Sequence, residues 1–342
     1  MTQTPTQGTS VDAVPFGTVF GETMAVAHWE DGSWSAPELS EVAPFQMHPA
    51  AHVLHYGSAC FEGLKAHRGE DGVVRIFRLD RHVERLRASA ERLYLPAPSV
   101  EMATAMIVDT VRSNRDDVPD PPGSLYLRPT LVGTAANIGA AGSPTSSAML
   151  FVLSSPVGDY FPGGMRPLRV AVETDRPRTT PQFGSVKTGA NYAMALGVTM
   201  EARALHGVDQ VLFMPGGTMQ ETGASNVMMM REDRIITPAI DGTFLEGVTR
   251  DSILMLAADR ELTVEERPIG LDELIDWCQD GEIALSGTAA VLAPVGTLVV
   301  DGVEVTVGDG EVGEATRSLR QALIDAQTAR VPDIHGWNRI VD

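Results

Sequence analysis

A stretch rich in proline and glycine at residues 156–167 constrains the fold of this chain more than any other feature. Its twelve residues include three prolines and three glycines, which disfavour the interiors of both helices and strands. The chain has 342 residues, which is long for one hydrophobic core and suits two. We therefore predict domains at 15–155 and 168–342, an interdomain loop at 156–167, and a flexible tail at 1–14.

Hydrophobic periodicity groups the strands and the helices instead of alternating them. A hairpin is predicted where the apolar run 24–29 meets the turn residues 30–33. Asp80 is expected to cap a helix that ends before Pro96, and a tight turn is expected at 286–288. Further helices are expected at 100–112, 190–205, 248–259, 271–279 and 315–329, and further strands at 73–78, 125–132, 148–154, 168–173, 210–214 and 227–230. This grouping predicts an α+β fold in each half.

Composition argues against several classes of function. Lys and Arg number 26 against 45 Asp and Glu, and the net charge of −19 disfavours nucleic acid or an anionic membrane as the main partner. No apolar run is long enough to span a membrane and no secretory leader is evident, so we expect a cytoplasmic protein. The two cysteines, Cys60 and Cys278, lack paired spacing, so we expect neither a disulfide framework nor a metal site. No dinucleotide fingerprint, P-loop or nucleophile-elbow motif occurs.

Lys187 is the strongest candidate for chemistry. It is one of only two lysines, with Lys65, and no charged side chain stands within eight positions of it. A lysine amine kept among small and apolar groups loses proton affinity and can form a Schiff base with a carbonyl. The alternative is a lysine near a helix start that extends its amine into water.

Three features suit an anion such as a phosphate. The helix start at Val248-Thr249 presents unpaired backbone amides, although Thr249 could equally be an ordinary helix cap. The Ser286-Gly287-Thr288 turn offers hydroxyls and open amides, as anion nests do. Arg85 is a further cation, but it lies among arginines, including Arg78 and Arg81, that we expect to form a solvated helix face.

Two features suit a carboxylate and a heterocycle. Tyr126 and Arg128 lie two positions apart on a predicted strand, so both side chains project from the same face. A phenol and a guanidinium together can bind a carboxylate, although an exposed surface pair is the alternative. Glu221 follows a turn and precedes an apolar strand, where it could keep a ring nitrogen protonated or be a surface turn residue.

Together, seven segments resemble, in order and spacing, the branched-chain amino-acid aminotransferases, which are fold-type IV enzymes that use pyridoxal 5′-phosphate. The segments are 55–65, 77–86, 89–93, 125–129, 186–193, 247–252 and 286–289. The resemblance implies two α/β domains with the cofactor at their interface, and a homodimer. It also implies transfer of an amino group from a branched-chain L-amino acid to 2-oxoglutarate, by a ping-pong route through a Lys187 aldimine. The implied partners are thus small amino acids and 2-oxo acids.

The resemblance also assigns roles to single residues. It makes Lys187 the Schiff-base lysine, Glu221 the partner of the pyridine nitrogen, and Tyr192 the phenol beside the ring oxygen of the cofactor. The phosphate site that it implies consists of Arg85, Val248, Thr249 and Thr288. The substrate-carboxylate site that it implies consists of Tyr56, Tyr126, Arg128, Thr288 and Ala289, and the implied pocket walls are Phe61, Val157 and Tyr160. We expect Arg128 to serve the acidic substrate while aliphatic contacts serve the branched chain.

Two segments depart from the family's pattern and affect the expected substrate range. The loop 137–142, which in the family reaches over the partner subunit's site, has Ala140 where a bulkier aliphatic residue is frequent. The run 224–230 keeps an asparagine but has methionines where aromatic residues are more usual. Alternatives within the fold are a transaminase of a specialised amino acid, a D-amino-acid transaminase and an aminodeoxychorismate lyase. A non-catalytic phosphate-binding module is a further alternative, which the presence of Lys187 argues against.

Overall fold

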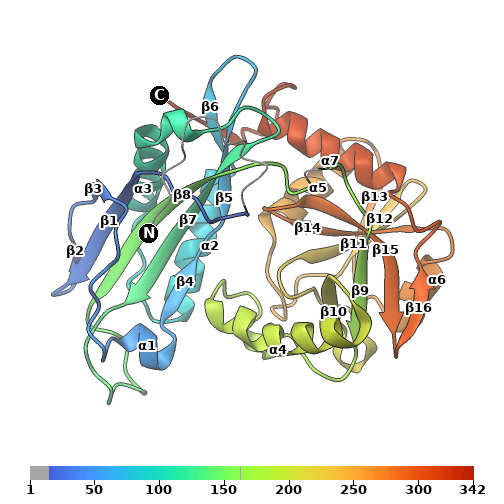
Figure 1. Ribbon diagram of the computed structural model, residues 1–342, viewed down its shortest axis with the longest axis horizontal. Coiled ribbons are helices and arrows are strands. Elements are labelled where there is room, and N and C mark those ends of the chain that lie inside the picture. The colour runs from blue at the N-terminus through green and yellow to red at the C-terminus, as the bar shows by residue number, and fades with distance from the viewer. Residues whose placement is uncertain (1–14, 162) are drawn as a thin grey trace. The chain divides into compact units, whose positions relative to one another are not determined.

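The computed structural model describes residues 15–161 and 163–342, so the predicted tail at 1–14 lies outside the described residues (Figure 1). The described chain divides into two compact units. Unit 1 contains 15–161, 186–189 and 326–342, and unit 2 contains 163–185 and 190–325. This division differs from the predicted domains because the short segment around Lys187 and the C-terminal residues belong to unit 1.

Unit 1 is built, in its described residues, on an antiparallel sheet of nine strands. The strands are β1 (Thr23–Glu30), β2 (Ser33–Trp34), β3 (Glu38–Glu41), β4 (Ala59–Phe61), β5 (Leu64–Arg68), β6 (Val74–Phe77), β7 (Ser124–Gly133), β8 (Ala148–Val157) and β17 (Asn338–Val341). The helices are α1 (His52–Tyr56), α2 (Leu79–Arg92) and α3 (Val100–Ser113). The order is β17-β6-β5-β7-β8-β1-β2, with β3 beside β1 and β4 beside β7. The C-terminal strand thus pairs with β6 of the same unit.

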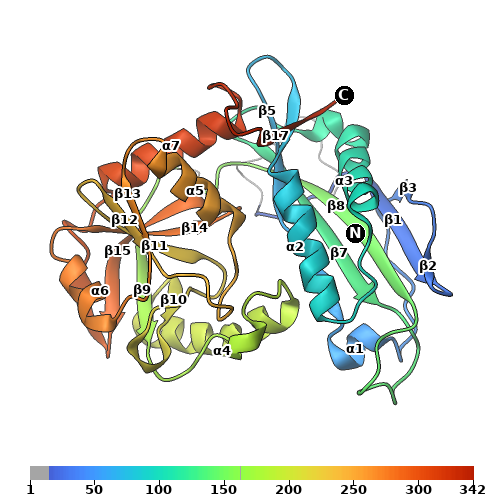
Figure 2. The ribbon, with the colours of Figure 1, turned by 180° about the vertical axis from the view of Figure 1, so that it is seen from behind.

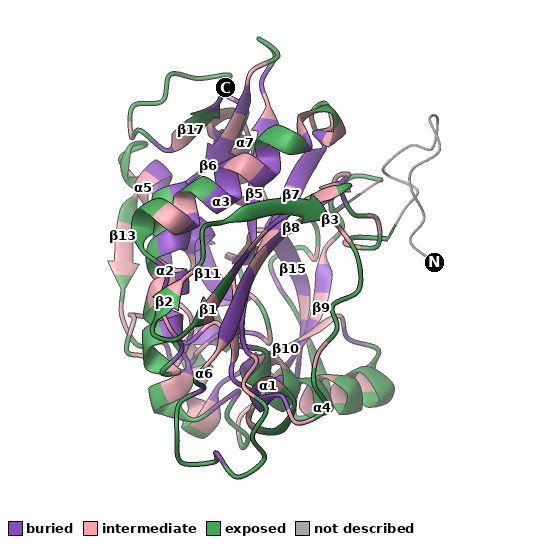
Figure 3. Ribbon diagram, turned by 90° about the vertical axis from the view of Figure 1, so that its left-hand side faces the viewer, coloured by how far each residue is buried: buried purple, intermediate pink, exposed green. Residues whose placement is uncertain are grey.

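The residues of β7 alternate between the two faces of this sheet. Leu125 and Leu127 are fully buried in a core that also contains Leu86 of α2. Figure 2 shows α2 and α3 beside this sheet, and Figure 3 shows buried residues along β7. Tyr126 and Arg128 project from the opposite face, because successive strand residues point to opposite sides. The sheet therefore separates these two polar side chains from the helices.

Unit 2 holds a mixed sheet of eight strands among its described residues. The strands are β9 (Leu168–Glu173), β10 (Gln210–Phe213), β11 (Asn226–Arg231), β12 (Arg234–Thr237), β13 (Thr263–Glu266), β14 (Glu282–Gly287), β15 (Val291–Val300) and β16 (Val303–Thr306). The helices, which lie mostly in unit 2, are α4 (Gly189–His206), α5 (Val248–Ala258), α6 (Leu271–Trp277) and α7 (Glu314–Gln327). Strand β9 is parallel to β10 and β15, and β12 is parallel to β13. Each unit combines helices with a sheet that contains antiparallel strand pairs, so the predicted α+β fold is confirmed, although strands and helices are interspersed along the chain in unit 2.

Elements with strong local signals form where they are predicted. The hairpin pairs Trp29 with Trp34. The helix predicted at 100–112 is α3, and the hydroxyl of its N-cap residue, Ser99, accepts the amide of Met102 at 3.1 Å. Helix α4 ends at His206 and is followed by Gly207, whose φ of 63° suits glycine. None of the helices among the described residues combines the length and apolarity that crossing a membrane requires.

Two local predictions are wrong. Asp80 does not cap α2, because the helix begins at Leu79 after Arg78, which has a left-handed φ of 50° and makes no side-chain cap. The turn predicted at 286–288 lies two residues further along the chain, at 288–290, because Ser286 continues β14 and pairs with residues of both neighbouring strands. Strand β8 also extends to Val157, within the predicted interdomain loop.

Candidate functional site

Lys187 is fixed to unit 1 by its backbone neighbours. The amide of Lys187 donates to the hydroxyl of Ser89 on α2 at 3.0 Å, and the amide of Phe61 on β4 donates to the carbonyl of Lys187 at 3.1 Å. The hydroxyl of Thr188 donates to the carbonyl of Ala59 at 2.7 Å. Three hydrogen bonds thus hold the backbone while the half-buried side chain of Lys187 extends from it.

Phe61 brings Lys187 close to the polar pair on β7. The Lys187 Nζ lies 5.3 Å from the centroid of the Phe61 ring, and the Arg128 Cζ lies 4.6 Å from the same centroid. Arg128 Nη2 also donates to the hydroxyl of Tyr126 at 2.7 Å. Gly63 packs directly against that phenol, since a Cβ at this position would collide with the Tyr126 hydroxyl. The structure therefore brings Lys187, Phe61, Tyr126 and Arg128 together, as the resemblance implies.

Arg85 is mostly buried beside Glu62, with 12% of its side chain exposed, and does not lie on a solvated helix face. Its Nε lies 2.7 Å from Glu62 Oε1 and its Nη2 lies 2.9 Å from Glu62 Oε2. The Nδ1 of His82 donates to Glu62 Oε2 at 2.7 Å. Burial alone would raise the pKa of Glu62, but the positive charge of Arg85 and the contact with His82 hold this pKa well below its usual range. Burial lowers the pKa of His82, so the fork of Arg85 supplies the compensating charge.

The two other arginines expected on that solvated face differ in their exposure. Arg78 is only 5% exposed, and its Cζ lies 5.1 Å from the ring centroid of Trp337. Arg81 is exposed and pairs with Glu84 on the same helix. The prediction of a solvated arginine face on α2 is thus correct for Arg81 and wrong for Arg78 and Arg85.

Three predicted pocket residues lie at other places in unit 1. The hydroxyl of Tyr56 on α1 donates to the carbonyl of Ile138, which ties the helix to the loop 137–142. Tyr160 is 44% exposed and packs edge-on against Phe161, with ring centroids 5.0 Å apart. Val157 is buried at the end of β8. Their roles in substrate binding stay predictions.

Glu221 is the centre of a buried charged cluster in unit 2. Its side chain forms an ion pair with Arg178, at 2.7 Å between Oε1 and Nη1, and each side chain is 3% exposed. Asn226 Nδ2 donates to Glu221 Oε2 at 3.1 Å, and the amide of Leu245 donates to Oε1 at 3.1 Å. The Cζ of Arg178 also lies 5.8 Å from the ring centroid of Tyr192. Glu221 is therefore not a surface turn residue, and its carboxylate is held in place by two hydrogen bonds and one ion pair.

The start of α5 lies beside this cluster. Its N-cap is Gly247 and makes no side-chain cap, so the alternative that Thr249 is the helix cap is wrong. A Cβ on Gly247 would collide with Asn226 Oδ1, so the helix start is close to Asn226. Ser286 is paired with Asn226 between β14 and β11, and its buried Oγ has no hydrogen-bond partner in the described residues. These groups suit an anion, because a helix start without a side-chain cap and a hydroxyl without a hydrogen-bond partner are available together.

Thr288 and Ala289 lie in the turn that follows β14, two and three residues after Ser286. Both are partly exposed, as is Tyr192 in the first turns of α4. The structure thus places Thr288, Ala289, Val248 and Thr249 on segments that flank the β11–β14 pair of unit 2.

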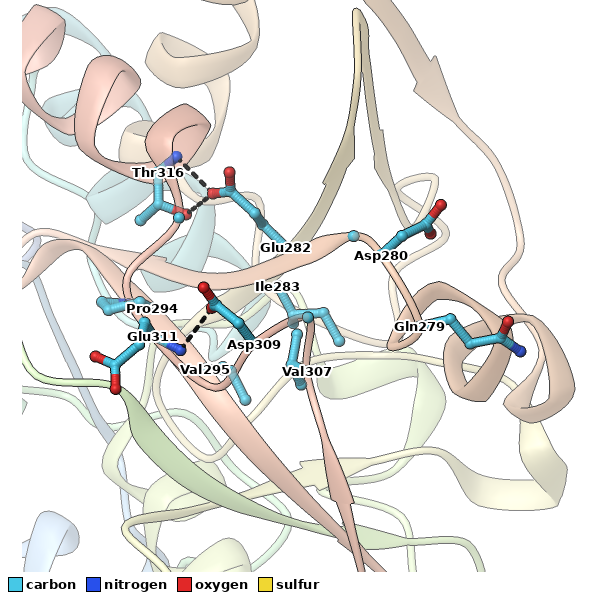
Figure 4. Close-up of a pocket in the computed structure, with 13 residues that line it drawn as sticks. Gln279, Asp280, Glu282, Ile283, Pro294, Val295, Val307, Asp309, Glu311 and Thr316 are labelled. Atoms are coloured by element: carbon cyan, nitrogen blue, oxygen red, sulfur yellow. Dashed lines mark hydrogen bonds between the residues drawn. The ribbon is translucent and has the colours of Figure 1, made fainter.

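A hollow of about 490 Å³ at another part of unit 2 has a structural role (Figure 4). Its lining includes Asp280, Glu282, Asp309 and Glu311. The carboxylate of Glu282 is used by the first turn of α7, where it accepts the amide of Thr316 at 2.8 Å and its hydroxyl at 2.7 Å. Across the described ranges, His, Cys, Asp and Glu nowhere gather in threes that could hold a metal ion. The hollow therefore offers neither a metal site nor any of the residues assigned above.

Glu62 and Arg178 were not predicted from the sequence as contributors to these sites, whereas the hydroxyl of Ser286 was. Glu62 and Arg85 are separated by 23 residues, and Arg178 and Glu221 by 43 residues. No local pattern links partners at such separations. The one sequence signal for Arg178 is the scarcity of charged residues around Lys187, because Arg178 is the nearest cation on the N-terminal side of that lysine.

Comparison with known proteins identifies the family. The profile of the amino-transferase class IV family matches residues 59–298. A Streptomyces coelicolor protein named "Probable branched-chain-amino-acid aminotransferase" is 38% identical over 335 residues, covering 94% of this chain and 91% of that protein. The Bacillus subtilis protein named branched-chain-amino-acid aminotransferase 2 is 36% identical, covering 94% of this chain and 90% of that protein.

The solved structures agree with this assignment. The branched-chain amino acid aminotransferase from T.th., solved with pyridoxamine 5′-phosphate, superposes with a TM-score of 0.77 at 28% identity, covering 93% of this chain and 99% of that one. The same enzyme has been solved with N-(5′-phosphopyridoxyl)-L-glutamate and with 4-methylvaleric acid. Family profile, relatives and fold converge, and this chain belongs to the class IV aminotransferases.

Proposed function

We propose that this chain transfers the amino group of the branched-chain L-amino acids leucine, isoleucine and valine to 2-oxoglutarate, giving branched-chain 2-oxo acids and L-glutamate. The observation that carries the proposal is the grouping of Lys187, Phe61 and Arg128 on unit 1, which unites an amine, an apolar ring and a cation. An amino acid with an aliphatic side chain needs the ring, and glutamate needs the cation.

The residues of both units fit pyridoxal 5′-phosphate. When bound, this cofactor accepts electrons from the substrate's α-carbon. Glu221 is a buried carboxylate that can keep a pyridine nitrogen protonated. The uncapped start of α5 and the unsatisfied hydroxyl of Ser286 suit the phosphate, and we infer that Val248, Thr249, Thr288 and Arg85 contribute to its binding. Tyr192, near Arg178, is the candidate for the ring oxygen.

Lys187 has two tasks in this proposal. Its amine would hold the cofactor, and it would move the proton to and from the α-carbon of the substrate. The three hydrogen bonds to α2 and β4 fix the backbone of the segment 187–188, so the amine can return to one position after each half-reaction. Phe61 excludes water from one side of the amine.

We include a homodimer and a cytoplasmic location in this proposal. The loop 137–142, held to α1 through Tyr56, is the candidate segment for reaching a partner subunit. Cys60 and Cys278 are both buried and unpaired, which suits a reducing compartment. Sedimentation of the purified protein tests the dimer, and a monomer with full activity would contradict it.

A donor screen tests the proposed reaction. The purified enzyme is given 2-oxoglutarate with L-leucine, L-isoleucine, L-valine, D-alanine or aminodeoxychorismate, and glutamate or pyruvate formation is followed. We expect turnover with the three branched-chain L-amino acids. Preference for D-alanine, or release of pyruvate from aminodeoxychorismate, would assign the chain to another activity of the fold.

A further inference from the structure

Lys65 lies on the same sheet face as the predicted carboxylate-binding pair. In the pairing of β5 with β7, Lys65 is directly opposite Tyr126, and in the pairing of β7 with β8, Ser155 is directly opposite Tyr126. Residues paired across antiparallel strands project to the same side of the sheet. Lys65, Tyr126 and Ser155 therefore form one row across three strands, which we call the Lys65 row. Lys65 is only 7% exposed in this row.

Several buried polar atoms on this face have no hydrogen-bond partner among the described residues. They are His67 Nε2, Ser124 Oγ, Ser155 Oγ and Arg128 Nε. Ser124 is two residues from Tyr126, and His67 is two residues from Lys65, so both lie on the face of the row. Buried polar atoms in folded proteins are almost always hydrogen-bonded. Their accumulation on one face indicates a surface built to meet a polar ligand.

The charge on this face is positive. Burial and the charge of Lys65 lower the pKa of His67 to about 3, so the imidazole of His67 is neutral near pH 7. Lys65 and Arg128 are cations on this face, and Arg75, which lies opposite His67 on it, is paired with Asp71. Because a buried cation is stabilised by a nearby anion, the face suits a carboxylate better than a neutral group.

Phe61 connects this face to the reacting amine. The ring of Phe61 is close to both the Lys187 Nζ and the guanidinium of Arg128. Arg128 in turn donates a hydrogen bond to the hydroxyl of Tyr126, which belongs to the Lys65 row. All of these residues belong to unit 1. A substrate that reacts at Lys187 and extends past Phe61 would bring the end of its side chain toward the row.

We propose that the Lys65 row binds the second carboxylate of the dicarboxylic substrate, and that Lys65 selects this acid over aliphatic 2-oxo acids. The aliphatic chain of a branched-chain substrate uses Phe61 and does not need the charge of Lys65. This inference rests on the proposed transamination. It makes Lys65 a second cation, besides Arg128, that binds the acidic substrate of one half-reaction and is not needed by the aliphatic substrate of the other.

The test compares the two amino acceptors on the aminated holoenzyme. Single-turnover kcat/KM is measured with 2-oxoglutarate and with 4-methyl-2-oxopentanoate for the wild type, Lys65→Met and Lys65→Arg. For Lys65→Met we expect a loss of about 10- to 100-fold with 2-oxoglutarate, the range for one charged hydrogen bond, and less than about threefold with the aliphatic acid. Lys65→Arg should recover most of the loss, because it restores the charge. Binding of glutarate, measured by calorimetry, should weaken by a similar factor in Lys65→Met.

Arg81→Met is the matched control, because it removes an exposed cation of α2 that pairs only on the helix surface. Ser155→Ala removes one hydroxyl from the row and replaces Lys65→Met if that variant fails to fold. It should lower kcat/KM for 2-oxoglutarate about 3- to 10-fold, with the aliphatic acid unchanged. Equal losses with both acids, or unchanged glutarate binding, would overturn the inference. A wild type that aminates neither acid would instead overturn the proposed function.

Discussion

Replacing Glu62 by glutamine keeps the size of a buried side chain and removes its charge. The Glu62 side chain is 1% exposed and accepts two hydrogen bonds from Arg85 and one from His82, at 2.7 to 2.9 Å. A glutamine has one acceptor oxygen, so its amide nitrogen would face another donor. At least one of these buried donors would therefore lose its acceptor in the variant.

The expected loss follows from the burial of both partners. Breaking a buried ion pair by removing one partner destabilises a protein by about 3–5 kcal/mol, because the remaining charge is uncompensated. The side chain of Arg85 is 12% exposed, so water relieves little of this penalty. Since glutamine can keep one hydrogen bond, we expect the free energy of unfolding of unit 1 to fall by about 3 kcal/mol.

Urea unfolding followed by tryptophan fluorescence measures this loss. Of the four tryptophans, Trp29, Trp34 and Trp337 lie in unit 1, so the signal reports mainly on that unit. Glu84→Gln is the control, because Glu84 is 61% exposed and pairs with Arg81 at 3.4 Å on the surface of α2. The control should change the free energy of unfolding by less than about 0.5 kcal/mol. A loss in Glu62→Gln below about 1 kcal/mol, or no greater than in the control, would refute this reasoning.

Two further variants test the sheet face of unit 1. Gly63→Ala places a methyl group against the Tyr126 hydroxyl. The variant should therefore have a higher KM for 2-oxoglutarate and a free energy of unfolding lower by about 1–3 kcal/mol. Kinetics and stability equal to those of the wild type would contradict the packing of Gly63 against Tyr126. His67 has a pKa of about 3 in the folded chain against an ordinary 6.5, so its contribution to stability is complete above pH 6.5 and is lost as the pH falls toward 3. His67→Gln should therefore reduce the pH dependence of unfolding in that window by up to about 1.4 kcal/mol per pH unit, and an unchanged slope would show that His67 is not buried as a neutral group.

The sequence predicts those parts of the fold that depend on neighbouring residues. Helix α3 forms as expected because its apolar periodicity and its N-cap residue, Ser99, lie in one short stretch of sequence. The expected cap at Asp80 fails because the left-handed conformation of Arg78 starts α2 one residue earlier. The turn expected at 286–288 fails because Ser286 gains partners in two neighbouring strands, and a short sequence cannot reveal such pairing.

The same distinction applies to the candidate site. Lys187 stands out in the sequence because lysine is so rare in this chain, and Tyr126 and Arg128 stand out because their spacing matches a strand face. The residues that contact these side chains cannot be predicted from spacing or composition. Glu62 becomes a partner of Arg85, and Lys65 becomes a neighbour of Tyr126, only when the order of strands β4, β5 and β7 is known.

Reductive labelling of the holoenzyme tests the central claim most directly. Borohydride treatment followed by peptide mass spectrometry locates any lysine that is covalently bound to the cofactor. The chain has only two candidates, Lys187 and Lys65, and both lie in unit 1, so the result is unambiguous. We predict a phosphopyridoxyl group on Lys187 alone, and this label should be lost when the enzyme is first incubated with L-leucine. A label on Lys65, or no label on either lysine, would contradict the account.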